Sequence, residues 1–453
     1  MKCSTALLVA NALLALAAGT TAQAQTPAAA SVPSRQGDLQ HFRTEFMARD
    51  RSFSAAARAE AESRLRHLDS TAATLSAAAF ELELARIVAL ADNGHTAARA
   101  SPRSSRYNRV PVRLTPFGDH FFVLRTDSAN ADLLGARLVA IDGKAVAEAI
   151  AVGRTLAGGT AGWRDRSVAY FLESPEQMHA LGLAAQVGRA TYRFELPGGA
   201  MVERGIGGQA PGPNRDRLPA GRWLYPHPLD PEFGTGKTLL TSEQAAWAFQ
   251  EYEMPFRWRD APEIDGMVVQ FRMNRDAPGR PIKEFLDEVR KEIRARHPRN
   301  LVIDLRMDSG GDLNTTRDFV RALPTLVPGQ IYALTSPWTF SAGISTLGYL
   351  EQASPGRVTI VGEGVGDRME FWAEGDLIEL PFSRAVIGYS PERHDYKTGC
   401  KPYRDCHQAV VRNPIGVPSL DPNLIAPWTI DAYRTGRDPG IEAIVAALGK
   451  PRT

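Results

Sequence analysis

Short apolar runs alternate with amphipathic helical patterns in the C-terminal half of the chain. Mostly apolar runs with the length of buried strands occur at residues 267–271, 301–305, 331–334 and 358–361. Apolar residues recur on one helical face from Ile282 to Ile293, and a second helix is predicted at about 341–351. This alternation predicts an α/β core over residues 264–450, with a partly parallel sheet buried by helices.

The region before the core has a helical composition. Residues 38–92 are rich in Ala, Glu, Arg and Leu and contain almost no Gly or Pro. Apolar side chains recur at helical spacing at Phe80, Leu84, Ile87 and Ala91. The pattern predicts a helix that runs up to Asp92 and stops at Asn93-Gly94. We therefore expect a helical N-terminal segment over residues 38–105.

Between these two parts the pattern changes to that of a small β module. Apolar runs at 121–124 and 137–141 predict strands, and Asp142-Gly143 is typical of a hairpin turn. We assign this module to residues 110–200. Residues 201–263 are predicted to be a linker or irregular segment, because much of this stretch is rich in Gly, Pro and Arg.

The first 24 residues have the pattern of a secretory signal peptide. Lys2 gives a positive start, residues 6–18 are almost wholly apolar, and Ala22-Gln23-Ala24 supplies small residues for cleavage. An uncleaved N-terminal anchor is the alternative, although the apolar run is short for a membrane span. Residues 25–37, rich in Ala, Pro and Ser, are expected to be a flexible leader. The pattern predicts an exported protein, periplasmic or extracellular, with no integral membrane segment after cleavage.

Composition narrows the class of protein. The 453 residues contain 53 Lys and Arg against 51 Asp and Glu, a formal net charge of +2. This balance argues against a nucleic-acid or membrane-surface binder, which would need a basic excess. Hydrophobic residues make up 43% of the chain and charged residues 23%, which is ordinary for a globular protein and excludes global disorder.

Two cysteines remain after the predicted cleavage, Cys400 and Cys406. An even pair in an exported protein favours a disulfide that closes a short polar loop. A metal site is the weaker alternative, because five intervening residues fit neither a zinc knuckle nor a haem-attachment spacing.

One candidate for chemistry is the end of the apolar run at 301–305. The chain continues through Asp308 into Gly310-Gly311, which would expose backbone N–H groups at the end of a buried strand. Such donors can hold an oxyanion. The alternative is a tight strand-to-helix turn in which glycine only supplies a positive φ.

A second candidate is Ser341, in the sequence Thr339-Phe340-Ser341-Ala342-Gly343. The serine follows a strand and lies at a predicted helix N-terminus, where the helix dipole favours a developing negative charge. The alternative, and the commoner use of serine at this position, is a helix N-cap.

A nucleophilic serine needs a base, and the chain has nine histidines. His95 lies in a loop directly after a predicted helix, whereas His394 and His407 lie in or next to the cysteine loop. Spacing alone does not select among them.

Taken together, the motifs resemble the tail-specific (C-terminal-processing) serine protease family, and more closely its tricorn-core and retinoid-binding-protein-like branch. The likeness extends over roughly residues 70–450 in the family's order. Its motifs are Asn93-Gly94-His95-Thr96, Asp304 to Gly311 with Asp308 in place of Asn, Thr339-Phe340-Ser341-Ala342, Val361-Gly362-Glu363, Gly416-Val417-Pro418 and Gly436-Arg437-Asp438-Pro439.

The resemblance implies a crotonase-like (ClpP-like) core and a PDZ-like module at 110–200. It implies that Ser341 is the nucleophile and that the N–H groups of Gly310 or Gly311, with that of Ala342, hold the oxyanion. Members with a Ser-Lys dyad have a lysine about two dozen residues after the serine, but residues 362–368 contain none. This departure points to the tricorn-like use of a histidine as general base, and His95 is the position that matches. The substrate would be a peptide or protein, with no metal or organic cofactor; the oligomeric state is not predicted.

Three departures from the family pattern support an alternative. Asn93 stands where the family usually has Asp, Ile344 stands where it often has Glu, and residues 412–414 lack the acid expected to orient the base. The alternative is a catalytically silent relative that binds a peptide or a hydrophobic ligand.

Overall fold

The computed structural model describes residues 34–210, 223–226 and 236–449. The predicted signal peptide at 1–24, most of the leader at 25–37 and parts of the predicted linker at 201–263 lie outside the described residues.

The C-terminal part is built on a six-stranded sheet. Its strand order is β18-β13-β12-β11-β10-β9, and all neighbours are parallel except β10 and β9. The strands are β9 (Phe256–Ala261), β10 (Gly266–Phe271), β11 (Asn300–Asp304), β12 (Ile331–Thr335), β13 (Val358–Gly362) and β18 (Leu424–Ile425). The four apolar runs predict β10 to β13 to within one residue at each end, so this part of the prediction is confirmed.

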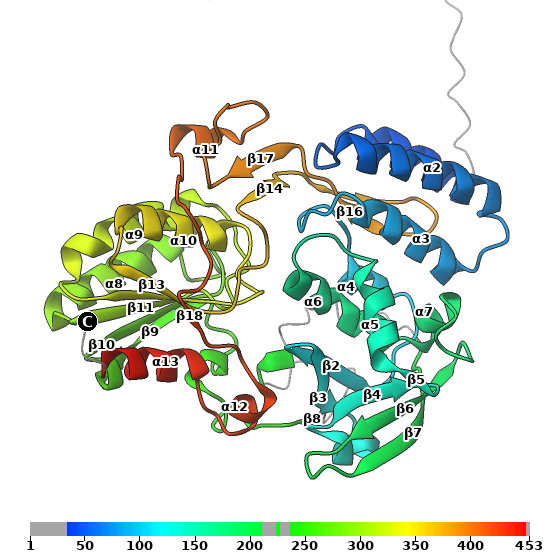
Figure 1. Ribbon diagram of the computed structural model, residues 1–453, viewed down its shortest axis with the longest axis horizontal. Coiled ribbons are helices and arrows are strands. Elements are labelled where there is room, and N and C mark those ends of the chain that lie inside the picture. The colour runs from blue at the N-terminus through cyan, green and yellow to red at the C-terminus, as the bar shows by residue number, and fades with distance from the viewer. Residues whose placement is uncertain (1–33, 211–222, 227–235, 450–453) are drawn as a thin grey trace, which may run out of the picture.

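Helices bury both faces of this sheet (Figure 1). Alternate strand residues such as Val269 and Ile303 pack against three helices, α8 (Ile282–Arg296), α9 (Asn314–Leu326) and α10 (Ala342–Ala353). The intervening residues Val268 and Val302 face Ile444 of α13 (Pro439–Leu448) on the other side. Both strand faces are apolar because both are covered, which explains the continuous rather than alternating pattern.

The N-terminal helices lie beside this core at the upper right of Figure 1. They are α1 (Arg35–His41), a π-helical turn (Phe42–Met47), α2 (Ala55–Thr71) and α3 (Ala77–Ala89). Ser54 and Ser76 cap α2 and α3 by accepting a backbone N–H bond, as serine does at helix starts. Helix α3 ends at Ala89, earlier than predicted, and Asp92 has a positive φ of 48°. The chain then continues into β1 (Ala97–Ala98) and α4 (Ala100–Ser104).

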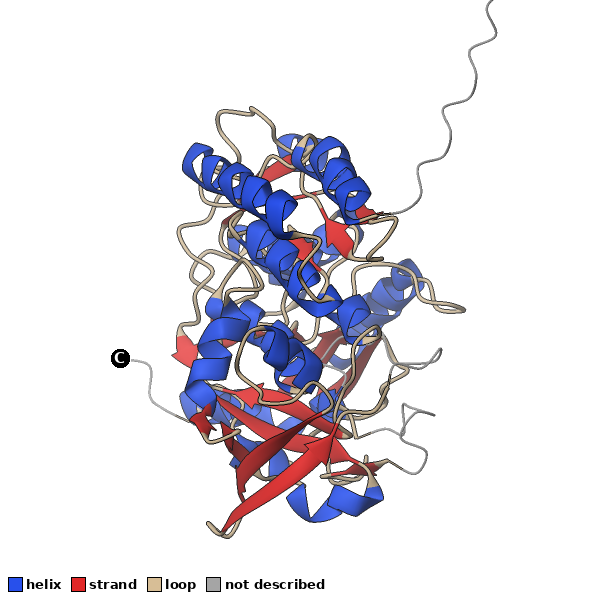
Figure 2. Ribbon diagram, turned by 90° about the vertical axis from the view of Figure 1, so that its right-hand side faces the viewer, coloured by secondary structure: helices blue, strands red, loops and turns tan. Residues whose placement is uncertain are grey.

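A second, antiparallel sheet lies at the lower right of Figure 1, and Figure 2 shows it from the side at the bottom of the molecule. Its path is β2-β3-β4-β6-β7, with β5 on β4 and β8 on β3. The strands are β2 (Val112–Phe117), β3 (His120–Thr126), β4 (Arg137–Ile141), β5 (Lys144–Ala145), β6 (Arg189–Glu195), β7 (Met201–Gly207) and β8 (Lys237–Thr238). The predicted strands at 121–124 and 137–141 are confirmed. Sequence patterns did not predict the helices of this region, α5 (Val146–Arg154), α6 (Ala161–Leu172) and α7 (Pro175–Ala180).

The prediction of irregular structure over 201–263 fails at both ends of that range, where β7 and β9 lie. Both are the last strands of their sheets. Edge strands of this kind carry exposed polar and charged side chains, so they lack the apolar pattern by which buried strands are recognised.

The remaining elements connect the two halves at the top of Figure 1. Strands β14 (Glu370–Ala373) and β17 (Glu392–Asp395) form a two-stranded ladder, and β16 (Val386–Gly388) pairs with β1 on one side and with β15 (Leu377–Glu379) on the other. Two short helices complete the fold, α11 (Gln408–Arg412) at the top of Figure 1 and α12 (Ile430–Arg434) at the bottom.

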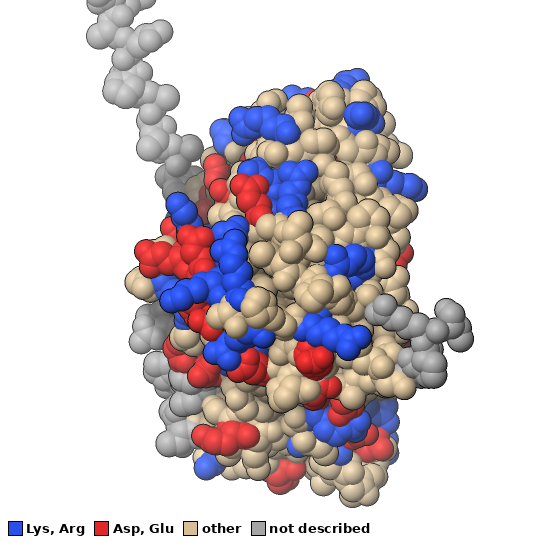
Figure 3. Space-filling view, turned by 90° about the vertical axis from the view of Figure 1, so that its left-hand side faces the viewer, with Lys and Arg blue, Asp and Glu red and all other residues tan. Residues whose placement is uncertain are grey.

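The surface agrees with the near-neutral charge. On the face drawn in Figure 3, basic and acidic side chains are interspersed rather than gathered into one patch of a single sign. No helix in the described part of the chain is long and apolar enough to cross a membrane.

Candidate active site

The loop after β11 is fixed by a buried ion-pair network. Arg306 pairs with Asp304 at the end of the strand and with Asp438 at the start of α13. Gly310 and Gly311 follow with φ values of 90° and 148°, which favour glycine. The network holds the glycine loop at the carboxyl end of a central strand.

Ser341 lies directly against this loop. A Cβ atom added to Gly310 would lie 2.5 Å from the Cβ of Ser341, so the absence of a side chain at 310 is what allows the contact. The sequence motifs at 304–311 and 339–342 are therefore brought together.

The backbone of Ser341 is in an unusual conformation, with φ 54° and ψ −126°. Such a conformation costs on the order of 1–3 kcal/mol for a residue with a side chain, and strain of this kind clusters at functional sites. Ser341 occupies the N-cap position of α10, but its side chain makes no capping hydrogen bond. The interpretation of this serine as a simple helix cap is therefore wrong.

Two backbone donors next to Ser341 are available. The N–H of Gly310 is not one of them, because it donates to Oδ1 of Asp308 at 2.9 Å. Among the described residues, no hydrogen bond uses the N–H of Gly311 or of Ala342. These two groups can donate to an added oxyanion without losing an existing bond.

His95 is held between two aromatic rings, one of which belongs to the residue before Ser341. Its imidazole stacks on Phe340 with ring centroids 4.2 Å apart and on Phe371 at 5.2 Å. Its Nε2 is buried and has no hydrogen-bond partner among the described residues. Phe340 directly precedes Ser341, so the predicted base contacts the segment that carries the predicted nucleophile; no hydrogen bond between the two side chains is present.

The sequence analysis found no acidic partner for His95, but the structure provides Asp367. Its Oδ2 lies 3.2 Å from Nδ1 of His95, and its side chain is only 1% exposed. Gly94 permits this approach, because a Cβ at that position would lie 2.8 Å from the same oxygen.

Asp367 was overlooked for a local reason. It lies in the stretch 362–368, where the family resemblance points to a lysine, whereas the same resemblance places the acid at 412–414. One signal could have found it. Residues 362–368 follow strand β13, and residues 304–311 follow strand β11. These two strands run in the same direction, so the segments that follow them lie at the same edge of the sheet.

Asp308, which stands where the family that the sequence resembles has Asn, is fully buried below the glycine loop. Burial raises the pKa of its carboxyl to about 7. The Asn274 amide satisfies its neighbours when its nitrogen donates to both Asp308 oxygens and its oxygen accepts from the hydroxyls of Thr316 and Thr346. These two donated bonds favour the charged carboxylate and oppose the rise in pKa.

The cysteine loop lies at the far end of the same ring stack. Phe371 stacks on His394 at 4.8 Å, and His394 stacks on His407 at 5.3 Å. The two histidines bind Glu374 and Glu392 respectively, and burial lowers the pKa of His394. Of the three histidines in the stack, only His95 contacts Phe340, the residue before Ser341. His394 and His407 are therefore poorer candidates for the base than His95.

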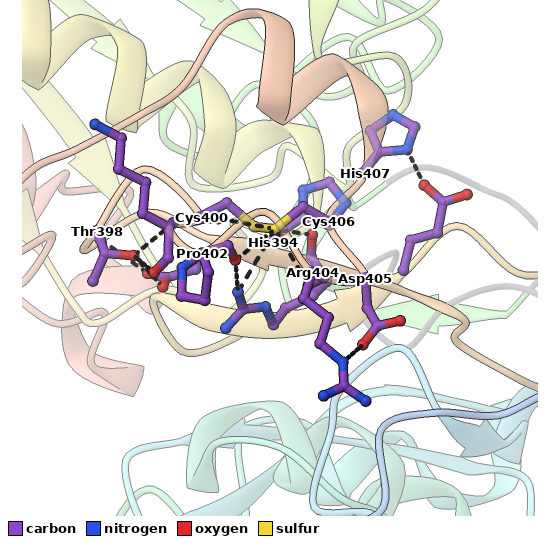
Figure 4. Close-up of a disulfide and its surroundings, with 12 residues drawn as sticks. His394, Thr398, Cys400, Pro402, Arg404, Asp405, Cys406 and His407 are labelled. Carbon is purple, nitrogen blue, oxygen red and sulfur yellow. Dashed lines mark hydrogen bonds and ion pairs between the residues drawn. A yellow bond between two sulfur atoms is a disulfide. The ribbon is translucent and has the colours of Figure 1, made fainter.

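A disulfide joins Cys400 and Cys406 and closes the loop directly ahead of His407 (Figure 4). Its sulfur atoms are 2.10 Å apart. Within the described residues, no group of three or more His, Cys, Asp or Glu side chains is arranged to hold a metal ion.

Comparisons with known proteins show the fold. No family model and no curated protein matches the chain. Among solved structures, mature CPAF complexed with lactacystin is 12% identical, with 91% of this chain and 97% of that chain covered and a TM-score of 0.55. A mutant of CPAF is 13% identical, with coverage of 91% and 96% and a TM-score of 0.53. The photosystem II D1 C-terminal processing protease is 13% identical, with coverage of 92% and 98%, but its TM-score is 0.39. The chain therefore shares the overall mixed α/β fold of CPAF.

Proposed function

We propose that the protein is a serine peptidase of the tail-specific protease family, in its tricorn-like branch, and that it acts on peptides or proteins. The observation that carries this proposal is the arrangement of Ser341, His95 and Asp367. A strained serine without a capping bond follows the phenylalanine on which an imidazole stacks, and Nδ1 of that imidazole is held by a buried carboxylate. Nucleophile, base and orienting acid are the parts that acyl transfer requires.

In the proposed reaction, the Oγ of Ser341 attacks the substrate carbonyl carbon while Nε2 of His95 takes the hydroxyl proton. Asp367 keeps the proton of the imidazole on Nδ1 and stabilises the imidazolium that forms. The carbonyl oxygen becomes an oxyanion that accepts from the N–H groups of Gly311 and Ala342.

The C–N bond then breaks, and His95 returns the proton to the leaving amine. Water hydrolyses the acyl-enzyme by the same proton route. The serine hydroxyl must rotate towards Nε2 for the first transfer. No capping bond holds it elsewhere.

The finer assignments belong to the same proposal. The core would be ClpP-like and the antiparallel module PDZ-like, which the strand order and the fold shared with CPAF support. The signal pattern at 1–24 and the disulfide favour an exported protein, periplasmic or extracellular.

A catalytically silent peptide-binding protein is the second candidate. The observation in its favour is that Ser341 and His95 are not hydrogen-bonded to each other, and that the ring of Phe340 covers one face of the imidazole. Apo active sites often have long or poorly aligned catalytic contacts, so this geometry is compatible with both functions.

A fluorophosphonate probe distinguishes the two. We expect it to label the wild-type protein and to fail with Ser341→Ala and His95→Ala. His67→Ala, which removes an exposed histidine of α2, is the matched control and should label normally. An unlabelled wild-type protein that still binds peptides would contradict the peptidase and favour the silent binder.

A further inference from the structure

A cavity of about 570 Å³ lies between the antiparallel module and the core. Its wall includes the turn between β2 and β3, the start of α6, residues 336–338 just ahead of Ser341, and Asp367. The cavity therefore extends from the acid behind His95 to surfaces that the proposed chemistry does not use.

Four arginines line this cavity, and three of them are ion-paired. The pairs are Arg154 with Asp165 and Asp119, Arg306 with Asp304 and Asp438, and Arg368 with Asp92. The fourth, Arg166, has no carboxylate partner within the described part of the chain, and its Nη1 is buried without a hydrogen-bond partner.

The environment of Arg166 leaves one direction free for a ligand. Its guanidinium lies 3.8 Å from the ring centroid of Trp163 and 4.0 Å from that of Trp338. The guanidinium is thus packed against two indoles, and its N–H groups point outward in its own plane, so further hydrogen bonds form at the edge of that plane. That edge presents N–H donors in the fork geometry that matches the two oxygens of a carboxylate.

The charge of this group is retained at neutral pH. Burial lowers the pKa of Arg166 to about 9, with the nearby Arg99 acting in the same direction. Acidic side chains also line the cavity, but several of them carry little net negative charge towards an incoming anion. Asp119 and Asp165 are paired with Arg154, and burial raises the pKa of Glu363.

Arg166 is connected to the candidate nucleophile by stacked rings. Trp163, which covers one face of the guanidinium, stacks on Phe340 at 3.5 Å, and Phe340 directly precedes Ser341. Trp338, the second indole against Arg166, lies three residues before Ser341. Direct ring contacts therefore join this site to the segment that carries Ser341.

We propose that Arg166 is a specificity-determining residue that binds a carboxylate of the peptide substrate in this cavity. The inference rests on the proposed peptidase function and adds a substrate class to it: peptides with a carboxylate near the bond that is cleaved. The carboxylate can come from an acidic side chain or from the free C-terminus, and the two sources share the same recognition chemistry.

Binding to the Ser341→Ala variant tests this without relying on catalysis. The probes are acetylated and amidated decapeptides of Ala, Leu and Ser that carry one Glu at successive positions, with Gln peptides as matched partners. A neutral decapeptide with a free C-terminus, compared with its amide, tests the second source. We expect at least one acid to bind about 10- to 100-fold more tightly than its neutral partner, as for a charge-assisted pair.

Arg166→Gln, added to Ser341→Ala, should reduce this preference to less than about threefold. Arg154→Gln, at a cavity arginine that is already paired, should keep it. If Arg166→Gln does not fold, Arg166→Lys provides the second test, because a lysine retains charge but not the planar fork and should keep only part of the preference. Equal binding of all acid and neutral pairs by the parent variant would overturn the proposal. Failure of the wild-type protein to cleave any peptide, with the preference intact, would overturn the peptidase function instead.

Discussion

The Oδ2 of Asp367 lies 3.2 Å from the Nδ1 of His95, although the two residues are 272 positions apart in the chain. The imidazole is fixed on three sides, by this carboxylate at its edge and by Phe340 and Phe371 on its faces. Its remaining nitrogen, Nε2, is the one without a partner among the described residues. The contact thus determines which nitrogen is free to act as a base.

Replacing Asp367 by Asn tests this role. The amide keeps the size of the side chain but can present its N–H to Nδ1, which favours the wrong tautomer of His95. We expect kcat to fall about a hundred- to ten-thousand-fold with little change in KM. Steady-state kinetics or the rate of fluorophosphonate labelling measures the effect. Asp287→Asn, at an exposed position of α8, is the control and should behave like the wild type. An Asp367→Asn protein of normal activity would show that the acid is only structural.

Gly310 should tolerate no side chain. A methyl group would lie 2.5 Å from the Cβ of Ser341, and the φ of 90° is unfavourable for any residue other than glycine. We expect Gly310→Ala to abolish labelling of Ser341 and to lower the free energy of unfolding by about 2 kcal/mol or more. Gly188→Ala is the matched control, because no atom lies within 4 Å of a Cβ at that position. Denaturant unfolding and labelling should both be normal for this control. If Gly310→Ala is as stable and as reactive as Gly188→Ala, the close contact between residues 310 and 341 is wrong.

The buried strands could be predicted from the sequence because their surroundings are uniform. Residues 301–305 are covered by helices on both faces, so the run is apolar throughout and hard to mistake. Strand β7 could not be predicted in the same way, since it lies at a sheet edge with mostly exposed side chains. Its stability comes from its ladder with β6, which leaves no apolar pattern in its own residues.

The residues of the candidate site also fall into those that the sequence predicts and those that it does not. Ser341 and the glycine loop carry local motifs, whereas the functional meaning of Asp367 and Arg166 arises from contacts between distant segments. Asp367 becomes significant only when the loop after β13 meets His95. Arg166 becomes significant only because it packs against Trp163 and Trp338 and no acid pairs with it among the described residues. A single sequence holds no record of such contacts.

The disulfide should stabilise the protein moderately. Closing a loop as short as that between Cys400 and Cys406 contributes about 2 kcal/mol in the chain-entropy model. We expect dithiothreitol to lower the Tm by about 2–4 °C in a protein of this size. Activity should fall only slightly, because His394 and Phe371 lie between His407 and His95. The double variant Cys400→Ser/Cys406→Ser should not respond to the reductant. Alkylation of both cysteines in the untreated, exported protein would contradict the bridge.

Asp308 should make both stability and activity depend on pH. The pKa of an aspartate is about 3.9 in an unfolded chain, and burial raises that of Asp308 to about 7. As pH rises from 4 to 7, the unfolded chain loses this proton first, so the folded state becomes less stable; above pH 7 the loss is complete. A negative charge below the glycine loop would also oppose the oxyanion of the proposed reaction.

Asp308→Asn removes this charge while an amide oxygen can still accept the N–H of Gly310. Relative to the wild type, we expect the variant to gain about 2 kcal/mol in free energy of unfolding between pH 4 and pH 8, measured in urea. The bonds from Asn274, which favour the charged form, keep this below the value that burial alone would give. Above pH 8, kcat/KM of the variant should exceed that of the wild type by about tenfold. Parallel pH profiles for the two proteins would show that Asp308 does not titrate in this range, and that its replacement of Asn has no electrostatic effect on the site.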